Sequence, residues 1–147
     1  MERRQHDDGT VTLSSGSGVF TFATVAPGVL LVTVRGSDTG QFGTAVLDEL
    51  HTAIQRFGRL ALFIDARETV VTSDKHAVPG LWAAWLTEHA DSLDGVHVLA
   101  DDRFTSLVLD ITKHVSRLRG LRVHRDLAPF EERLRAFAPA AALGTGG

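Results

Sequence analysis

The feature that most constrains the fold is an unbroken apolar run, Leu-Ala-Leu-Phe-Ile at residues 60–64, which Asp65 ends. A strand with one face in water alternates apolar and polar residues, whereas this run has no polar position. Such a run is typical of a strand buried on both faces of a parallel sheet. In open α/β sheets the carboxyl ends of the strands border the binding crevice. The run therefore predicts a central parallel strand that places Asp65 and the following loop at that crevice.

Strands and helices are expected to alternate around this central strand. Two short strands within residues 10–25 flank the Gly-rich turn 14–18, and with a strand at 29–34 they indicate an antiparallel hairpin. Apolar residues at helical spacing then predict a helix ending at Gly58, a helix from near Pro79, and further helices after Asp101 and Asp126, with strands at 96–100 and 121–124. The predicted fold is α/β, an N-terminal antiparallel hairpin leading into a mainly parallel sheet of right-handed strand–helix units.

The chain is expected to form one domain over residues 10–137, because 147 residues suit a single core. Residues 1–9 and 138–147 are predicted to be flexible termini. In the later strands, His97, Arg122 and His124 point away from their apolar neighbours. These strands should therefore have one apolar and one mixed face, with helices covering one face of the sheet more completely than the other.

Composition removes several classes of function. The chain has no cysteine, which excludes disulfides, thiol catalysis and thiolate metal sites. Its net charge is −3, and no face is basic enough to follow phosphates, so nucleic acid is not an expected partner. Residues 1–8 do not have the pattern of a signal peptide, and no apolar run has the length of a membrane span. A cytoplasmic protein is the expectation.

The order of elements, with Leu-Val-Thr-Val-Arg-Gly at 31–36, Leu-Phe-Ile-Asp-Ala-Arg at 62–67 and the later helices, resembles the STAS-type domains over roughly residues 28–137. The resemblance is to the anti-sigma-factor antagonists, and in particular to their SpoIIAA-like branch. It implies a right-handed coil of strand–helix units and a regulatory, non-catalytic role with a protein partner. Antagonist members are switched by phosphorylation of a serine after the central strand, and Ser73 lies near that position. The family motif there is Asp-Ser, then Ser or Ala, then Gly, whereas this chain reads Thr-Ser-Asp-Lys at 72–75.

The predicted binding loop follows the central strand and includes Asp65, Arg67, Ser73, Asp74 and His76. Asp65 has two interpretations: it ends the strand by accepting hydrogen bonds from the loop, or it shapes a binding crevice. Ser73 is either a turn residue or a phosphoacceptor near a helix N-terminus. The sequence leaves both choices open.

A second candidate site is an apolar pocket lined by Trp82, Trp85 and Phe104, although such aromatic residues are more often part of the core. The SpoIIAA-like branch is also related in fold to the CRAL-TRIO lipid carriers, which implies the alternative of a carrier for a small apolar ligand. The histidines lie on different predicted elements without HxH or HExxH spacing, so no metal site and no cofactor are predicted. Without a nucleophile elbow or P-loop, no catalytic residue and no enzymatic activity are predicted.

The first functional hypothesis is thus a non-enzymatic regulatory or protein-interaction module, and the alternative is the apolar-ligand carrier. A homodimer is also expected, formed through the hairpin that contains Phe20 and Phe22 or through the mixed face of the sheet. At least one of the two phenylalanines should be buried in the domain, and the other is a candidate for the interface.

Overall fold

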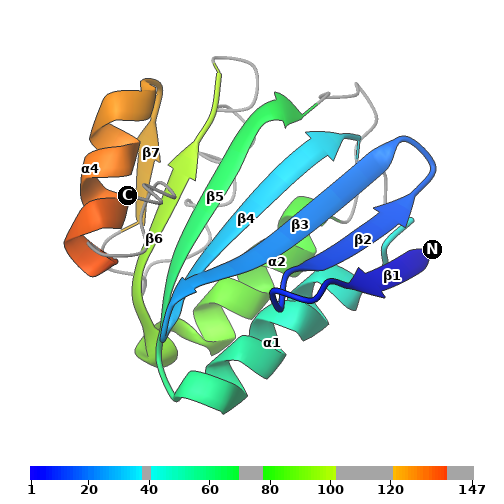
Figure 1. The fold of residues 1–147 in the computed structure, drawn as a ribbon, viewed down its shortest axis with the longest axis horizontal. Coiled ribbons are helices and arrows are strands. Elements are labelled where there is room, and N and C mark those ends of the chain that lie inside the picture. The colour runs from blue at the N-terminus through cyan, green and yellow to red at the C-terminus, as the bar shows by residue number, and fades with distance from the viewer. Residues whose placement is uncertain (38–40, 70–77, 102–120, 139–147) are drawn as a thin grey trace.

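The computed structural model describes residues 1–37, 41–69, 78–101 and 121–138. Its centre is one seven-stranded sheet in which every strand pairs with its neighbours in the chain, in the order β1-β2-β3-β4-β5-β6-β7 (Figure 1). The strands are β1 (Glu2–Gln5), β2 (Val11–Ser15), β3 (Gly18–Ala26), β4 (Val29–Gly36), β5 (Leu60–Thr69), β6 (Leu93–Leu99) and β7 (Leu121–His124). The helices are α1 (Ala45–Phe57), α2 (Val78–Glu88), the short 3-10 helix η1 (Ala90–Ser92) and α4 (Leu127–Phe137).

The sheet is mixed, so the prediction of a mainly parallel sheet is wrong. Strands β1 to β4 are antiparallel to one another, and only β4 to β7 are parallel. Sheet rather than helix dominates this α/β fold, because the antiparallel part is a four-stranded meander and not a hairpin.

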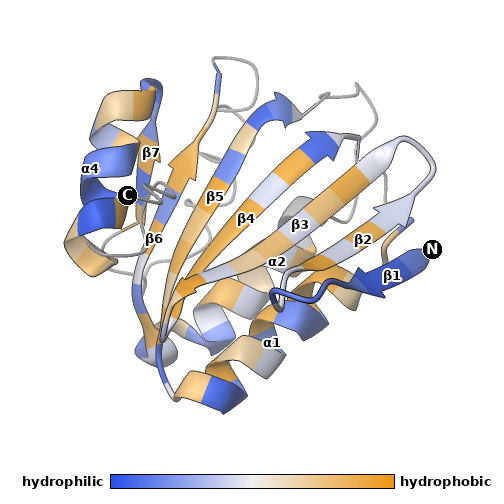
Figure 2. Ribbon diagram, in the orientation of Figure 1, coloured by the Kyte–Doolittle hydropathy of each residue, from blue (hydrophilic) through white to orange (hydrophobic). Residues whose placement is uncertain are grey.

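The additional strand is β1, which lies within the terminus predicted to be flexible. Its sequence is entirely polar, so it shows no apolar alternation, and Figure 2 shows it as a hydrophilic strand. It is held by backbone pairing with β2 and by an ion pair in which Arg3 Nε lies 2.5 Å from Glu49 Oε1 on α1. An ion pair between residues so far apart in the sequence produces no periodic pattern in it, so β1 could not be predicted from the sequence.

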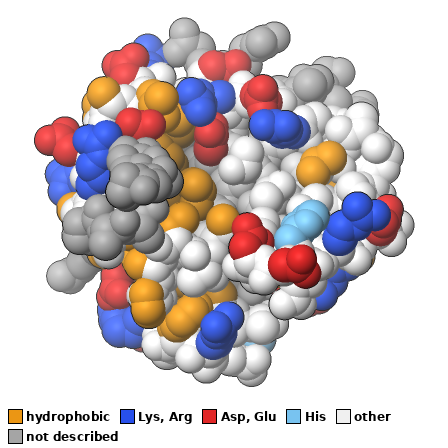
Figure 3. Space-filling model, in the orientation of Figure 1, with side chains coloured by type: hydrophobic (Ala, Val, Ile, Leu, Met, Phe, Trp, Pro, Cys, Tyr) orange, Lys and Arg blue, Asp and Glu red, His pale blue; other side chains and the backbone are white. Residues whose placement is uncertain are grey.

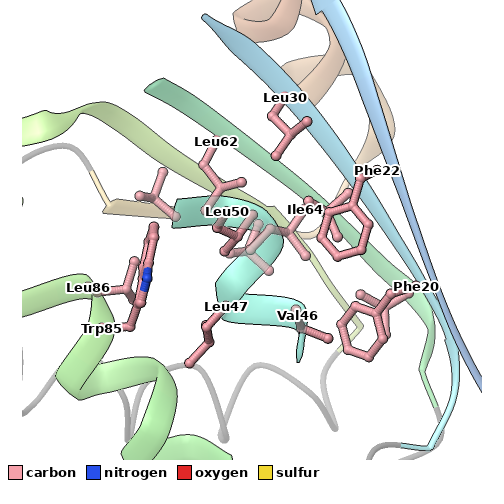
Figure 4. Packing of buried hydrophobic residues seen from close by; sticks show 14 of the residues in the cluster. Phe20, Phe22, Leu30, Val46, Leu47, Leu50, Leu62, Ile64, Trp85 and Leu86 are labelled. Atoms are coloured by element: carbon pink, nitrogen blue, oxygen red, sulfur yellow. The ribbon is translucent and has the colours of Figure 1, made fainter. Parts of the chain in front are cut away.

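Consecutive strand order places the connecting helices on one face of the sheet. Right-handed crossovers that always advance in the same direction leave their helices on the same side. Accordingly, α1 and α2 lie together behind the sheet in Figure 1 and share one core with it, seen from close by in Figure 4. The labelled side chains of that core come from five elements, β3, β4, β5, α1 and α2: Phe20, Phe22, Leu30, Val46, Leu47, Leu50, Leu62, Ile64, Trp85 and Leu86.

The opposite face of the sheet has a smaller core under α4. Phe130 and Leu134 of α4 pack there against Phe63 and Leu99 of the neighbouring strands β5 and β6. Helices therefore cover one face of the sheet more completely than the other, as the alternation of residue types at positions 97 and 122–124 predicted.

The central strand β5 contributes to both cores. All residues from 60 to 64 are buried; Leu62 faces α1 and α2, whereas Phe63 faces α4. This confirms the burial on both faces that the apolar run predicted. Among the described residues, no helix is both long and apolar enough to cross a membrane.

Candidate functional site

The candidate site is the part of the second sheet face that α4 does not contact, which we call the open face. It comprises the side chains of β1 to β5 that point away from α1 and α2, apart from those buried in the core under α4, such as Phe63. Successive residues of a strand point to opposite faces of the sheet. In β2 and β3, buried residues such as Leu13 and Phe20 therefore face the helices, and half-buried ones such as Thr12 and Thr21 face the open side. Figure 3 shows this face, on which uncharged surface lies between groups of charged side chains.

A row of aligned polar side chains crosses the open face. Arg4 of β1 is opposite Thr12, Thr12 opposite Thr21, Thr21 opposite Thr33, and Thr33 opposite Asp65. Neighbouring strands lie about 4.8 Å apart, so the five strands place this row along roughly 19 Å. Three threonine residues are thus aligned between an arginine and an aspartate.

Two further rows flank this polar row. The row nearer the carboxyl end of β5 is mixed in character and contains Glu2, Ser14, Val19, Arg35 and Glu68. The row on the other side begins with Ala23 and Leu31 and continues under α4 as Phe63, His97 and Arg122. The open face therefore changes from charged to apolar toward α4, where Figure 3 shows hydrophobic side chains.

Asp65 and Arg67, two residues of the predicted binding loop, form the charged end of the polar row on β5. Arg67 Nε lies 3.0 Å from Asp65 Oδ1 and Arg67 Nη2 lies 2.8 Å from Asp65 Oδ2, and the Arg67 backbone N–H also donates to Oδ1. Partial burial alone would raise the pKa of Asp65, but these hydrogen bonds and the charges of Arg67 and Arg35 outweigh it and lower that pKa. The pair is thus a fixed, ionised group on the strand, and not part of the loop.

The remaining residues of the predicted loop, Ser73, Asp74 and His76, lie outside the described residues. The interpretation of Ser73 as a phosphoacceptor therefore stays a prediction. A second ion pair stands beside the first, because Arg35 Nε of β4 lies 2.7 Å from Glu68 Oε2 of β5. The carboxyl ends of β4 and β5 consequently present two arginines that are each already neutralised within the chain.

A shallow depression of about 220 Å³ lies at the other end of the open face. It is lined by Glu2, Arg4, His6, Thr12 and Ser14, all on or next to β1 and β2. His6 Nε2 is 3.0 Å from the Thr12 hydroxyl, which fixes the imidazole at the edge of the depression. This concavity gives the open face a polar recess at its β1 edge.

Under α4, a pair of stacked histidines joins β6 to β7. His97 Nδ1 lies 3.1 Å from His124 Nε2, and the His97 ring stacks on Phe63 with centroids 4.8 Å apart. Burial, together with the charges of His124, Arg133 and Arg122, lowers the pKa of His97 to about 4. This pair is therefore neutral near pH 7 and belongs to the packing between the sheet and α4.

The predicted apolar pocket is only partly within the described residues. Trp85 is buried in the core between α2 and the sheet, Trp82 packs partly buried against the same core, and Phe104 lies outside the described residues. Phe20 and Phe22 are both buried in that core as well. Neither phenylalanine is thus available for an interface, and the expectation that one of them would serve a homodimer is wrong.

Sequence reasoning did not find the polar row. Its threonines occupy the half-buried positions of three predicted strands, a signal that was present in the sequence. Alignment across strands, however, depends on register, which the hydrophobic pattern and the geometry of the turns set together in the folded sheet. Searches of this chain against protein-family models, curated proteins and solved structures found no match.

Proposed function

We propose that this protein is a non-enzymatic protein-interaction module of regulatory type, and that the open face is its binding surface. The observation that carries the proposal is the polar row, an aligned set of half-buried or exposed side chains on five hydrogen-bonded strands that no described helix covers. A surface fixed by a sheet loses little conformational freedom when it binds, which favours affinity.

The chemistry of the open face suits a protein partner. Threonine presents both a hydroxyl, which donates and accepts hydrogen bonds, and a methyl group, and Leu31 and Ala23 add apolar area beside the row. Protein interfaces combine an uncharged centre with a polar rim. Here the rim charges Arg35, Glu68 and Arg67 are already paired within the chain, so a partner need not neutralise them.

The state of Asp65 supports recognition in preference to catalysis. A general acid or base works best when its pKa lies near the working pH. The two hydrogen bonds from the Arg67 guanidinium and the charge of Arg35 instead lower the pKa of Asp65, because they favour its ionised form. A permanently charged carboxylate in a polar row fixes the orientation of a partner but does not transfer protons.

The STAS-type relationship is part of the same proposal. Its basis is the sequence resemblance; in the run β4–α1–β5–α2–β6, strands and helices alternate and the strands pair in parallel, as that resemblance implies for this part of the chain. A regulatory protein partner is the function that this relationship suggests.

The proposal is tested by differential affinity capture from a lysate of the source organism. Thr21→Arg places a long cation in the middle of the open face, and the matched control Gln55→Arg adds the same charge to an exposed position of α1. Circular dichroism should show that both variants melt as the unmodified protein does.

Proteins captured by the unmodified chain and by Gln55→Arg, but not by Thr21→Arg, would support the open face as the binding surface. Equal capture by all three forms would contradict it. Cross-links from the captured partner should then map to β2, β3 and β4 and not to α1.

A further inference from the structure

Two histidines that are far apart in the sequence meet on the helical side of the protein, away from the open face. His51 is an exposed residue of α1, and His89 directly follows α2. His51 Nδ1 lies 3.2 Å from His89 Nε2, and the two rings are inclined by 71° with centroids 5.3 Å apart. The helices that cover one face of the sheet are thus joined by two imidazoles.

The His89 ring is oriented by its neighbours. Its Nδ1 is 2.9 Å from the backbone carbonyl oxygen of Trp85, and its ring stacks on the Trp85 indole with centroids 4.4 Å apart. A carbonyl only accepts, so Nδ1 carries the hydrogen of the neutral ring and Nε2 presents its lone pair toward His51. Histidines that bind metals usually have this arrangement, in which one ring nitrogen donates to a carbonyl and the other coordinates the ion.

The separation of the two nitrogens matches two ligands of one ion. Zinc–nitrogen bonds of about 2.0–2.1 Å place adjacent ligand nitrogens roughly 3 Å apart. The geometry points to a binding site for a divalent transition ion such as Zn²⁺ between His51 and His89, with water in the remaining coordination positions. Imidazole pairs also suit Ni²⁺ and Cu²⁺, whereas Mg²⁺ prefers oxygen ligands.

The environment distinguishes this pair from the other histidine pair. His97 and His124 have nearly the same nitrogen separation, 3.1 Å, but His97 is only 4% exposed and the pair lies near Arg122 and Arg133. A dication there would be buried next to two cations, which is electrostatically costly. His51 is exposed instead, so an ion reaches the site from solvent and keeps its water ligands.

A bound ion would connect α1 to α2. Because these helices pack on the same face of the sheet, such a link would stabilise the folded state by mass action as metal is added. A direct hydrogen bond from His51 Nδ1–H to His89 Nε2 explains the same distance without an ion, and the experiment must separate the two.

The test is calorimetric titration of the untagged protein with ZnCl₂ at pH 7.5, with MgCl₂ as the blank. His51→Gln keeps an N–H donor for the hydrogen bond but removes a zinc ligand. His51→Cys does the reverse: it removes the N–H donor and supplies a thiolate, which is a good zinc ligand. His6→Gln is the matched control, because it removes another exposed histidine. The chain has no cysteine of its own, so the new thiol is unique.

We expect one Zn²⁺ per chain for the unmodified protein and for His6→Gln. Loss of a supporting hydrogen bond already weakens metal sites by about tenfold or more, so loss of a ligand in His51→Gln should weaken zinc binding at least as much. His51→Cys should restore it. Absence of zinc binding by the unmodified protein, zinc binding by His51→Gln equal to that of the unmodified protein, or failure of His51→Cys to restore binding would each overturn the site.

Discussion

Acid should loosen the attachment of α4 to the sheet through the buried histidine pair. His97 stacks on Phe63, contacts His124 through a ring nitrogen, and lies near Arg122 and Arg133. Protonation of His97 would place a charge in this packed, positively charged surrounding. The folded state therefore favours the neutral ring, whose pKa is about 4 compared with 6.5 for an ordinary histidine.

The sign and size of the effect follow from this difference. Between pH 6.5 and 4 the unfolded chain binds a proton at His97 that the folded chain does not, so stability must fall as the pH is lowered through this window. Each pKa unit corresponds to about 1.4 kcal/mol, so the full loss would be roughly 3 kcal/mol, of which about 2 kcal/mol is reached by pH 5. The pKa of His124 is lowered as well, by burial and by the same arginines, and its contribution has the same sign.

The assay is urea unfolding at pH 7 and pH 5, followed by circular dichroism. His97→Leu fills a similar volume without a titratable group. The drop in its free energy of unfolding from pH 7 to pH 5 should therefore be about 2 kcal/mol smaller than the drop for the unmodified protein. His6→Gln, which removes an exposed histidine, should keep the full pH dependence. A His97→Leu protein with the same pH dependence as the unmodified protein would refute the reasoning, whatever its stability at pH 7.

Three further predictions concern packing, backbone and assembly. Phe63→Ala should cost about 3–5 kcal/mol in urea unfolding, because the fully buried ring packs against His97 and Phe130; an unchanged midpoint would contradict this. Gly36→Ala should cost more than about 1 kcal/mol, because its φ is +73° and a Cβ would collide with the backbone of Ser17. The homodimer expected from the sequence, through the hairpin or the mixed face of the sheet, should give a dimer mass in light scattering at micromolar concentration; a monomer mass for the unmodified chain would contradict that expectation.

Features set by local periodicity were predicted well. The apolar run at 60–64 indicated burial on both faces, because only a strand between two cores tolerates five consecutive apolar residues. Gly58 was predicted to end α1, and it does so with a φ of +81°, a conformation that favours glycine. Strand β7 was recognised at residues 121–124 from its strict alternation.

Features that depend on contacts between distant segments were not predicted. Strand β1 has no apolar residue to mark it, and its pairing with β2 and its ion pair to α1 appear only in the folded chain. The same holds for the candidate site: Thr12, Thr21 and Thr33 align only because the turns fix the register of three strands. His51 and His89 meet because α1 and α2 pack side by side, which no spacing in the sequence reveals.

The consecutive strand order also has a consequence for how the protein folds. Each strand pairs with the one made immediately before it, so no early strand has to wait for a distant segment to arrive. The antiparallel strands β1 to β4 close only short loops, and contacts that are local in sequence form fastest. During synthesis the sheet can therefore grow by one strand at a time, each exposed edge serving as the template for the next strand. The parallel strands follow more slowly, because a longer connection separates each of them from its template, with α1 before β5 and α2 before β6.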